Sequence, residues 1–370
     1  MEVMMKELGE IITGNTPSKK TEAFWSSEDI CFIKPDIIAD DGINEIVDSN
    51  EYISENARKK ARIVGKNSIF ITCIGSIGKI GIASDGEYAF NQQINAIIPN
   101  DRVQPKYLAY NLLFNKPRFV AIANAPVVPI INKSQFGEFT VNIETDIDRQ
   151  CEIVDVLDKF TQIIQQRNKE ISALDELIKA RFVEMFEKGN HEIVKASEIC
   201  DFITKGTTPT TGEIAEEYND GKIPFLKVYN LSFTGEMLFE NNPQYIPKET
   251  HDGKLARSKV YPNDVLMNIV GPPLGKFALV TDEFDEWNIN QAIAIFRAKD
   301  RILPRFLLHA LMQPKVLEPF IGQAVGIRQQ NLSLEQCRSL QIPLPSLEEQ
   351  QSFVEFAKQV DKSKFINQLL

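Results

Sequence analysis

The segment Cys73–Ala83, CIGSIGKIGIA, contains the residue types of a phosphate-binding loop. A nucleotide-binding P-loop has G-x-x-x-x-G-K followed by Ser or Thr, whose hydroxyl binds the metal ion. Here Ile80 follows Lys79, and in a second occurrence, GPPLGK, Phe277 follows Lys276. The sequence therefore argues against a nucleotide site. It favours two hairpins whose lysines either contact a nucleic-acid phosphate or face solvent.

Residues suited to catalysis or metal binding are sparse. The three histidines do not have the spacing of a metal site or a catalytic triad; they are His191, His251 and His309. The five cysteines form no C-x-x-C pair, which argues against structural zinc and disulfides and favours reduced thiols. No G-x-S-x-G, G-x-G-x-x-G or Asn-Pro-Pro-aromatic segment occurs. We therefore expect a binding module with no catalytic residues, no metal and no cofactor of its own.

The chain is internally duplicated, with a period of about 195 residues. The matching segments keep their order in both copies. They are ITGNTP (12–17) with ITKGTTP (203–209), ICFIKPDIIADDG (30–42) with IPFLKVYNLSFTG (223–235), GSIGK (75–79) with GPPLGK (271–276), FNQQINAI (90–97) with INQAIAIF (289–296), and PKYL (105–108) with PRFL (304–307). The chain is therefore one domain duplicated.

The residues that recur are polar and lie between the apolar runs. They are Thr16 with Thr208, Lys34 with Lys227, Arg62 with Arg257, Lys79 with Lys276, and Asn91-Gln92 with Asn290-Gln291. Asn and Gln can make paired contacts to adenine, and Lys can contact guanine or phosphate. Alternatively, the Asn-Gln pairs satisfy backbone groups at strand ends, and the basic runs are solvated. Specificity is expected where the copies diverge, at Ala123–Lys133 and at Gly322–Asn331, which contains Arg328 and Gln329.

Each copy has the pattern of short strands followed by a helix, which predicts an α+β domain. The runs Ile30–Ile33, Ser68–Ile74 and Ile94–Ile98 are β-branched and bounded by turn residues. The segments Lys106–Asn115 and Arg305–Gln313 have apolar residues at helical spacing.

The segment that joins the copies predicts a long helix. From 146 to 188 it has no proline or glycine, and at about 1.5 Å per residue it would span roughly 60 Å. Its apolar residues occupy heptad positions and form a seam for a partner helix: Leu157, Phe160, Ile164, Ile171, Leu174 and Ile178. The same element restarts at Ser346–Ala357. We expect domains at 1–145 and 189–345, a central helix at 146–188, and a C-terminal helix at 346–370 that pairs antiparallel with it. The result would be a dumbbell with pseudo-two-fold symmetry.

The composition suits a folded protein with selective partners. The chain has 370 residues, 43% of them hydrophobic, and a net charge of −10. This acidity argues against nonspecific coating of nucleic acid, but it allows a local basic face. The sequence shows no signal peptide and no apolar run long enough for a membrane span, so we expect a soluble cytoplasmic protein without a membrane partner.

The whole chain resembles the specificity subunits of type I restriction-modification systems. The resemblance rests on the doubled G-x-T-P segment, the doubled G-x-x-G-K hairpin followed by Asn-Gln, and IPLPSLEEQQSFV (342–354), which enters the last helix. The first copy of that entry, VNIETDIDRQCEIV (141–154), lacks both prolines.

The resemblance implies two similar target recognition domains separated by an antiparallel pair of long helices. Each domain would read half of a bipartite site in double-stranded DNA from the major groove. The helices would set the spacer and hold two methyltransferase subunits, which carry the S-adenosylmethionine chemistry, and restriction subunits would complete the complex. The alternatives are a duplicated scaffold that binds only proteins, and a nuclease or transferase whose isolated chain turns over substrate. The target, the spacer length and whether the complex cleaves DNA do not follow from the sequence.

Overall fold

The structure is a computed structural model that describes residues 1–123, 128–189, 191–219, 221–321 and 331–369. Contacts between residues divide the chain into two compact units, Met1–Ile164 and Gln165–Leu370. The division falls within helix α4 (Ile147–Phe182), so each unit holds part of it. The domain boundaries expected at 145 and 189 remain a prediction.

The first unit combines three sheets with short helices. Its elements are β1 (Glu2–Met4), η1 (Met5–Glu7), β2 (Gly9–Thr13), η2 (Glu22–Phe24), β3 (Ile30–Ile33), β4 (Ile43–Ile46), β5 (Tyr52–Ile53), η3 (Glu55–Lys60), β6 (Ile63–Val64), β7 (Ile69–Thr72), β8 (Ile80–Ala83), β9 (Tyr88–Phe90), β10 (Ile94–Pro99), α1 (Pro105–Phe114), α2 (Lys116–Ile122), α3 (Lys133–Glu138), β11 (Thr140–Asn142) and the start of α4. The expected strands at 30–33, 68–74 and 94–98 and the helix at 106–115 are confirmed to within a few residues.

The second unit begins within α4 and repeats this order. Its elements are the end of α4, η4 (Val183–Glu187), β12 (Glu192–Lys195), α5 (Ala196–Ile199), β13 (Cys200–Lys205), η5 (Thr211–Glu213), β14 (Lys222–Leu226), η6 (Val228–Asn230), η7 (Phe239–Asn241), β15 (Tyr245–Pro247), α6 (Lys248–Asp252), η8 (Ala256–Ser258), β16 (Lys259–Val260), β17 (Val265–Asn268), β18 (Phe277–Leu279), β19 (Trp287–Ile289), β20 (Ile293–Ala298), α7 (Pro304–Leu311), α8 (Pro314–Ile321), α9 (Leu334–Ser339), β21 (Gln341–Leu344) and α10 (Leu347–Leu369).

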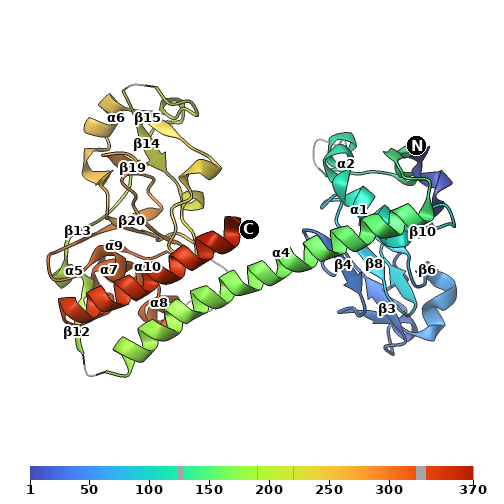
Figure 1. The fold of residues 1–370 in the computed structure, drawn as a ribbon, viewed down its shortest axis with the longest axis horizontal. Helices are drawn as coiled ribbons and strands as arrows, with labels where there is room; N and C mark the ends of the chain where they lie inside the picture. The colour runs from blue at the N-terminus through green and yellow to red at the C-terminus, as the bar shows by residue number, and fades with distance from the viewer. Residues whose placement is uncertain (124–127, 190, 220, 322–330, 370) are drawn as a thin grey trace. The chain divides into compact units, whose positions relative to one another are not determined.

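The strand order shows that the two units share one topology (Figure 1). The order β2-β10-β7-β8-β4 in the first unit corresponds to β13-β20-β17-β18 in the second, where β4 has no counterpart among the described strands. The smaller sheet β5-β3-β9-β6 corresponds to β15-β14-β19-β16, and β1-β11 corresponds to β12-β21. The duplication inferred from the sequence is thus a duplication of the fold.

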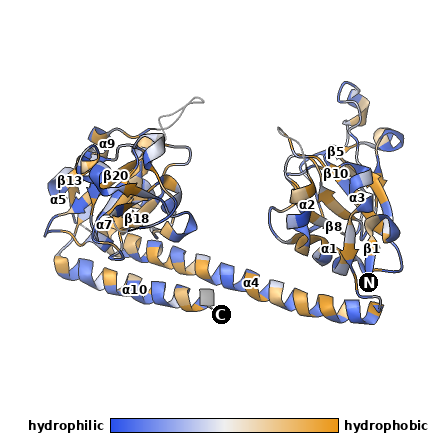
Figure 2. Cartoon of the chain, turned by 90° about the horizontal axis from the view of Figure 1, so that it is seen from above, coloured by the Kyte–Doolittle hydropathy of each residue, from blue (hydrophilic) through white to orange (hydrophobic). Residues whose placement is uncertain are grey.

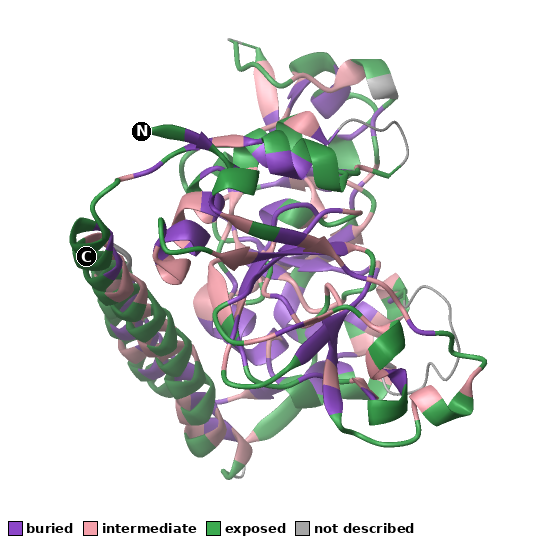
Figure 3. Cartoon of the chain, turned by 90° about the vertical axis from the view of Figure 1, so that its right-hand side faces the viewer, coloured by how far each residue is buried: buried purple, intermediate pink, exposed green. Residues whose placement is uncertain are grey.

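The sheets are buried on the faces that hold the apolar runs of the sequence. All four residues of β7 and all four of β17 are buried, and Figure 3 shows the central strands as the buried part of the molecule. In the first unit β7 pairs antiparallel with β8, and in the second β17 pairs antiparallel with β18. The GSIGK (75–79) and GPPLGK (271–276) segments are therefore the turns of two hairpins, as the sequence predicts.

In the second unit, α10 packs antiparallel against the end of α4. Phe182 of α4 stacks edge-on against Phe353 near the start of α10, with ring centroids 5.4 Å apart. Further along α10, Lys364 pairs with Asp175 at 2.8 Å, and Arg167 donates to the Oδ1 atom of Asn367 at 3.1 Å. Contacts that run in opposite directions along the two helices establish the antiparallel arrangement (Figure 1).

The apolar seam of α4 is covered over only part of its length. Ile178 is buried, and Leu174 packs against the same core, whereas Leu157 and Ile171 are half-buried. Phe160 is 60% exposed and Ile164 is 59% exposed, contrary to a seam buried along the whole helix. The pairing in the second unit ends near Arg167 because α10, read antiparallel from Phe182, reaches its last turn there. Figure 2 shows apolar patches continuing along α4.

Candidate nucleic-acid interface

The doubled G-x-T-P segment lies against the doubled Asn-Gln turn in both units. Gly14 N–H donates to the carbonyl of Ile94 at 3.0 Å, and a Cβ atom at Gly14 would lie 2.1 Å from the carbonyl oxygen of Asn91. In the second unit, a Cβ atom at Gly206 would lie 2.1 Å from the carbonyl oxygen of Asn290. Only glycine permits this close approach of two backbones, so the two motifs recur together.

The side chain of the first residue of each Asn-Gln pair forms hydrogen bonds within its own turn. Asn91 is buried, and its Nδ2 donates to Gln93 Oε1 at 2.9 Å while its Oδ1 accepts the Gln93 N–H at 3.0 Å. Asn290 Oδ1 accepts the N–H of Ala292 at 3.2 Å. These hydrogen bonds agree with the alternative interpretation, in which the Asn side chains satisfy backbone groups at strand ends.

The second residue of each pair is exposed beside the threonine of the G-x-T-P segment. Thr16 Oγ1 donates to Gln92 Oε1 at 2.8 Å in the first unit. In the second unit both Thr208 and Gln291 are exposed. These side chains can reach a partner without unfolding the turn.

The basic runs contact the G-x-T-P segments. In the first unit, Asn15 Nδ2 donates to the carbonyl of Lys60 at 2.6 Å, and Arg62 follows with its side chain exposed. In the second unit, Arg257 is exposed and its Nε donates to Thr207 Oγ1 at 3.1 Å. In each unit the basic run is thus hydrogen-bonded to the G-x-T-P segment. The candidate residues Arg62 and Gln92 of the first unit, and Thr208, Arg257 and Gln291 of the second, are exposed.

Lys34 and Lys227 follow the strands that hold the Asn-Gln turns. Asn91 N–H donates to the carbonyl of Ile33, and Asn290 N–H to that of Leu226, each at 3.1 Å. Lys34 pairs with Glu51 at 2.6 Å, and this hydrogen bond lowers the pKa of that carboxyl. Lys227 is half-buried and forms no ion pair within the described ranges.

Each G-x-x-G-K hairpin is closed by a side chain from its first strand. Thr72 Oγ1 accepts the N–H of Lys79 at 3.0 Å. Asn268 occupies the matching position and accepts the N–H of Lys276 at 2.6 Å. In a phosphate-binding loop the backbone N–H groups point at the ligand, whereas these two are consumed inside the turn. The turns therefore do not offer these two N–H groups to a ligand. The sequence pattern alone did not indicate that Thr72 and Asn268 close the hairpins.

The two hairpin lysines have different surroundings. Lys79 Nζ pairs with Asp40 at 2.7 Å and donates to the carbonyls of Pro35 and Ile38 at 3.2 and 3.4 Å. Lys276 Nζ lies 5.6 Å from the centroid of the Phe233 ring. Arg328 and Gln329, predicted as base-reading residues, lie outside the described residues, as does most of the segment that contains them.

A buried glutamine fixes each domain to its long helix. Gln150, near the start of α4, accepts the N–H of Gln104 at 2.7 Å and donates to the carbonyls of Arg102 and Glu144 at 3.2 and 2.7 Å. Gln350, near the start of α10, makes the corresponding contacts with Leu303, Arg301 and Pro345 at 2.8, 3.1 and 3.0 Å. Both side chains are fully buried. The signal in the sequence was the glutamine shared by DRQ and EEQ at the two helix entries.

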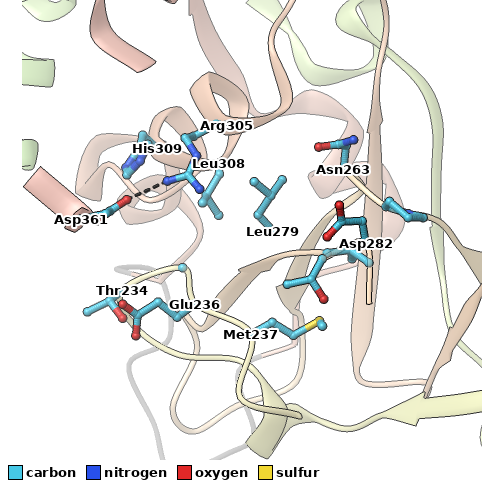
Figure 4. A pocket seen from close by; sticks show the side chains of 14 residues that line it. Thr234, Glu236, Met237, Asn263, Leu279, Asp282, Arg305, Leu308, His309 and Asp361 are labelled. Atoms are coloured by element: carbon cyan, nitrogen blue, oxygen red, sulfur yellow. Dashed lines mark hydrogen bonds and ion pairs between the residues drawn. The ribbon is translucent and has the colours of Figure 1, made fainter. Parts of the chain in front are cut away.

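A second contact between domain and helix differs between the units. In the first, Lys106 and Tyr110 of α1 both bind Asp158 of α4, at 2.6 and 2.7 Å. In the second, Arg305 of α7 binds Asp361 of α10 at 2.7 Å (Figure 4). The residue that matches Tyr110 is His309.

His309 lines a cavity of 530 Å³ in the second unit (Figure 4). Its side chain is buried and its Nε2 atom has no hydrogen-bond partner in the described part of the chain. Burial lowers the pKa of His309 to about 4. Glu236 and Asp282 also line the cavity. Arg305 lines it too, and its charge is neutralised by Asp361. This charge balance does not suit a DNA phosphate.

One group of potential metal ligands occurs in the described ranges, formed by His251, Asp252 and Glu286. Lys259 Nζ pairs with Asp252 and lies 3.6 Å from Glu286, so an ammonium group already neutralises the carboxylates. Asn288 Nδ2 donates to His251 Nδ1 at 3.0 Å, which leaves the hydrogen of the neutral ring on Nε2, facing Glu286 at 3.4 Å. Only His251 of this group is buried, and the two carboxylates are partly exposed and paired with Lys259, so the group gives no support to a metal site.

Comparison with known families identifies the chain. A family model described as "Type I restriction modification DNA specificity domain" matches residues 1–173 and 188–370, one match for each copy of the repeat. The chain belongs to this family. Its members are the non-catalytic DNA-recognition components of restriction-modification complexes, which agrees with the sparse catalytic chemistry of the sequence.

Relatives and solved structures extend this result. The MjaIX specificity subunit of Methanocaldococcus jannaschii is 28% identical over 61% of this chain, and the match spans 57% of that relative's length. The MjaVIII specificity subunit of the same organism is 24% identical over 82% of this chain and 74% of its own length. A type I S subunit from M. genitalium aligns with a TM-score of 0.51 at 15% identity, covering 100% of this chain and 91% of that one.

A chain from a study of the assembly and conformational transition of a type I restriction-modification system aligns with a TM-score of 0.53 at 17% identity. It covers 99% of this chain and 91% of that one. These similarities confirm the expected α+β fold of two domains with long helices. No helix among the described residues is long and apolar enough to cross a membrane.

Proposed function

We propose that the chain is the sequence-recognition subunit of a type I restriction-modification complex, in which each domain reads one half of a bipartite site in double-stranded DNA. The observation that carries the proposal is the duplication of one fold, matched twice by the family model, with the halves joined by the continuous helix α4. Two similar domains suit two separate half-sites, and their divergent segments allow the half-sites to differ.

The long helices are proposed to dock two methyltransferase subunits. Exposed apolar residues that precede the α10 pairing on α4 support this role; they include Val156, Phe160, Ile163 and Ile164. A stripe of this kind is unfavourable in water and marks a surface for a protein partner. S-adenosylmethionine would be bound by those partners, and restriction subunits would complete a cleaving complex in the cytoplasm.

The decisive test is base-resolution mapping of DNA methylation in cells that express this chain with the methyltransferase subunits of its system. The expected result is methylation at one bipartite site. Four residues inserted after Gln165, between the apolar stripe and the α10 pairing that begins at Arg167, should lengthen α4 by about 6 Å. The spacer should then grow by about one or two base pairs, with both half-sites unchanged. A changed half-site would contradict the proposed role of the helix.

Docking is tested by co-purification of the complex. Phe160→Asp should abolish capture of the methyltransferase subunits, because it places a charge in the apolar stripe. Gln162→Asp, at an exposed polar position on the same helix, should leave capture unchanged. A scaffold that binds only proteins would retain capture in the wild type and show no sequence-specific methylation.

A further inference from the structure

The lysine of each G-x-x-G-K hairpin meets the same position of the preceding loop, and the residue there differs. In the aligned segments ICFIKPDIIADDG and IPFLKVYNLSFTG, Asp40 matches Phe233. Lys79 pairs with Asp40, and Lys276 lies over the ring of Phe233. One structural contact has thus become an ion pair in the first domain and a cation–π contact in the second.

The ion pair makes the first hairpin a poor partner for DNA. The side chain of Lys79 is only 14% exposed, and its ammonium group is bound by one carboxylate and two carbonyls. The side chain of Asp40 is 87% exposed, so the group nearest to solvent is negative. A phosphate would have to displace Asp40 from Lys79 and would meet its charge on approach.

The second hairpin presents the opposite chemistry. Within the described residues no carboxylate lies at ion-pair distance from Lys276, so its positive charge is not compensated there. Phe233 is 54% exposed. Its loop is held in place because Ser232 and Phe277 exchange two backbone hydrogen bonds, at 3.0 and 2.7 Å. The aromatic ring and the lysine are therefore fixed side by side at the surface.

We infer that Phe233 and Lys276 form a DNA-contact pair that only the second domain possesses. Lys276 binds a backbone phosphate, and the Phe233 ring packs on the adjacent deoxyribose or on a thymine methyl group, the apolar surfaces that duplex DNA offers to such a ring. Lys79, by contrast, fastens its own loop. This inference rests on the proposed function and assigns unequal roles to two residues that the sequence treats as equivalent.

The test measures binding of the complex with its methyltransferase subunits to a duplex carrying the mapped site and to an unrelated duplex of equal length, across a salt series. Lys276→Gln should weaken binding to both duplexes and reduce the slope of log K against log salt by about 1, as loss of one phosphate contact does. Phe233→Ala should weaken binding several-fold with a smaller change in slope. Lys315→Gln, which removes an exposed charge from the same domain, controls for net charge.

The same measurements on variants of the first domain provide the comparison. Lys79→Gln should lower thermal stability and leave the salt slope of the folded complex unchanged, and Asp40→Asn should leave it unchanged as well. An unchanged slope for Lys276→Gln, or a slope that falls equally for Lys79→Gln, would overturn the inference while leaving the proposed function intact. Absence of any preference for the mapped site in the wild-type complex would instead overturn the proposed function, and this inference with it.

Discussion

The two domains keep the same frame and differ in the chemistry attached to it. Gly14 and Gly206 make the same close backbone contact, and Gln150 and Gln350 make the same three hydrogen bonds. The partner of the hairpin lysine, in contrast, differs between the domains. Residues that hydrogen-bond to backbone groups are constrained by the fold. The type of a surface residue is not constrained in this way and can differ between the domains according to the ligand. The comparison thus separates structural motifs from candidate recognition residues.

The largest effect is expected for the buried glutamines near the starts of α4 and α10, Gln150 and Gln350. Gln150→Leu and Gln350→Leu should each lower the free energy of unfolding by about 3 kcal/mol or more, because each removes a fully buried amide and the three hydrogen bonds that it makes to the backbone. Gln351→Leu, at an exposed position beside Gln350, should change it by less than about 0.5 kcal/mol. Urea denaturation measures all three. A large loss in one domain only would show that the entries are not equivalent.

Substitution of the glycine at each close backbone contact is expected to lower stability almost as much. Gly14→Ala and Gly206→Ala should each cost about 2 kcal/mol or more, since the new Cβ atom overlaps a backbone carbonyl that cannot move without breaking the turn. Gly212→Ala, where a Cβ atom would meet nothing within 4 Å, is the matched control. Thermal unfolding of the three variants measures the cost. Tolerance of either substitution would contradict the structural role assigned to the G-x-T-P segment.

Acid sensitivity should distinguish the second domain from the first. Burial lowers the pKa of His309 to about 4, below its usual value of 6.5; Asp361 acts to raise it, and Arg305 and Lys364 to lower it further. Between these two pH values the unfolded chain binds a proton that the folded chain excludes, so stability falls as pH falls through this range.

The expected contribution of His309 is a loss of about 2 kcal/mol between pH 7 and pH 5. His309→Gln should remove that part of the pH dependence, and urea denaturation at the two pH values measures it. The matching residue of the first domain, Tyr110, carries no charge in this range and should contribute nothing. An identical pH dependence in wild type and variant would refute the assignment.

The smallest effect concerns the contact of the first domain with α4. Asp158→Asn weakens the contacts with Lys106 and Tyr110, and it should cost about 1 kcal/mol or less because the lysine is 43% exposed and screened by water. The loss should shrink further in high salt, which thermal unfolding at two ionic strengths checks. A loss as large as that of Gln150→Leu would mean that this ion pair, and not the glutamine, fastens the domain.

The sequence alone predicted the duplication, the strands at 30–33, 68–74 and 94–98, the helices at 106–115 and 305–313, and the long helix between the copies. These features depend on local pattern: runs of β-branched residues, heptad spacing and recurring turn residues. It also pointed to the family, because the motifs recur in order along both halves.

The tertiary structure decided which recurring polar residues serve the fold. Asp40 lies 39 positions before Lys79 in the chain, and nothing local indicates that the two will pair. Heptad spacing likewise shows which face of α4 is apolar but not what covers it, so the exposure of Phe160 and Ile164 followed only from the structure. A side chain's role is set by its partner in space, and that partner comes from long-range packing.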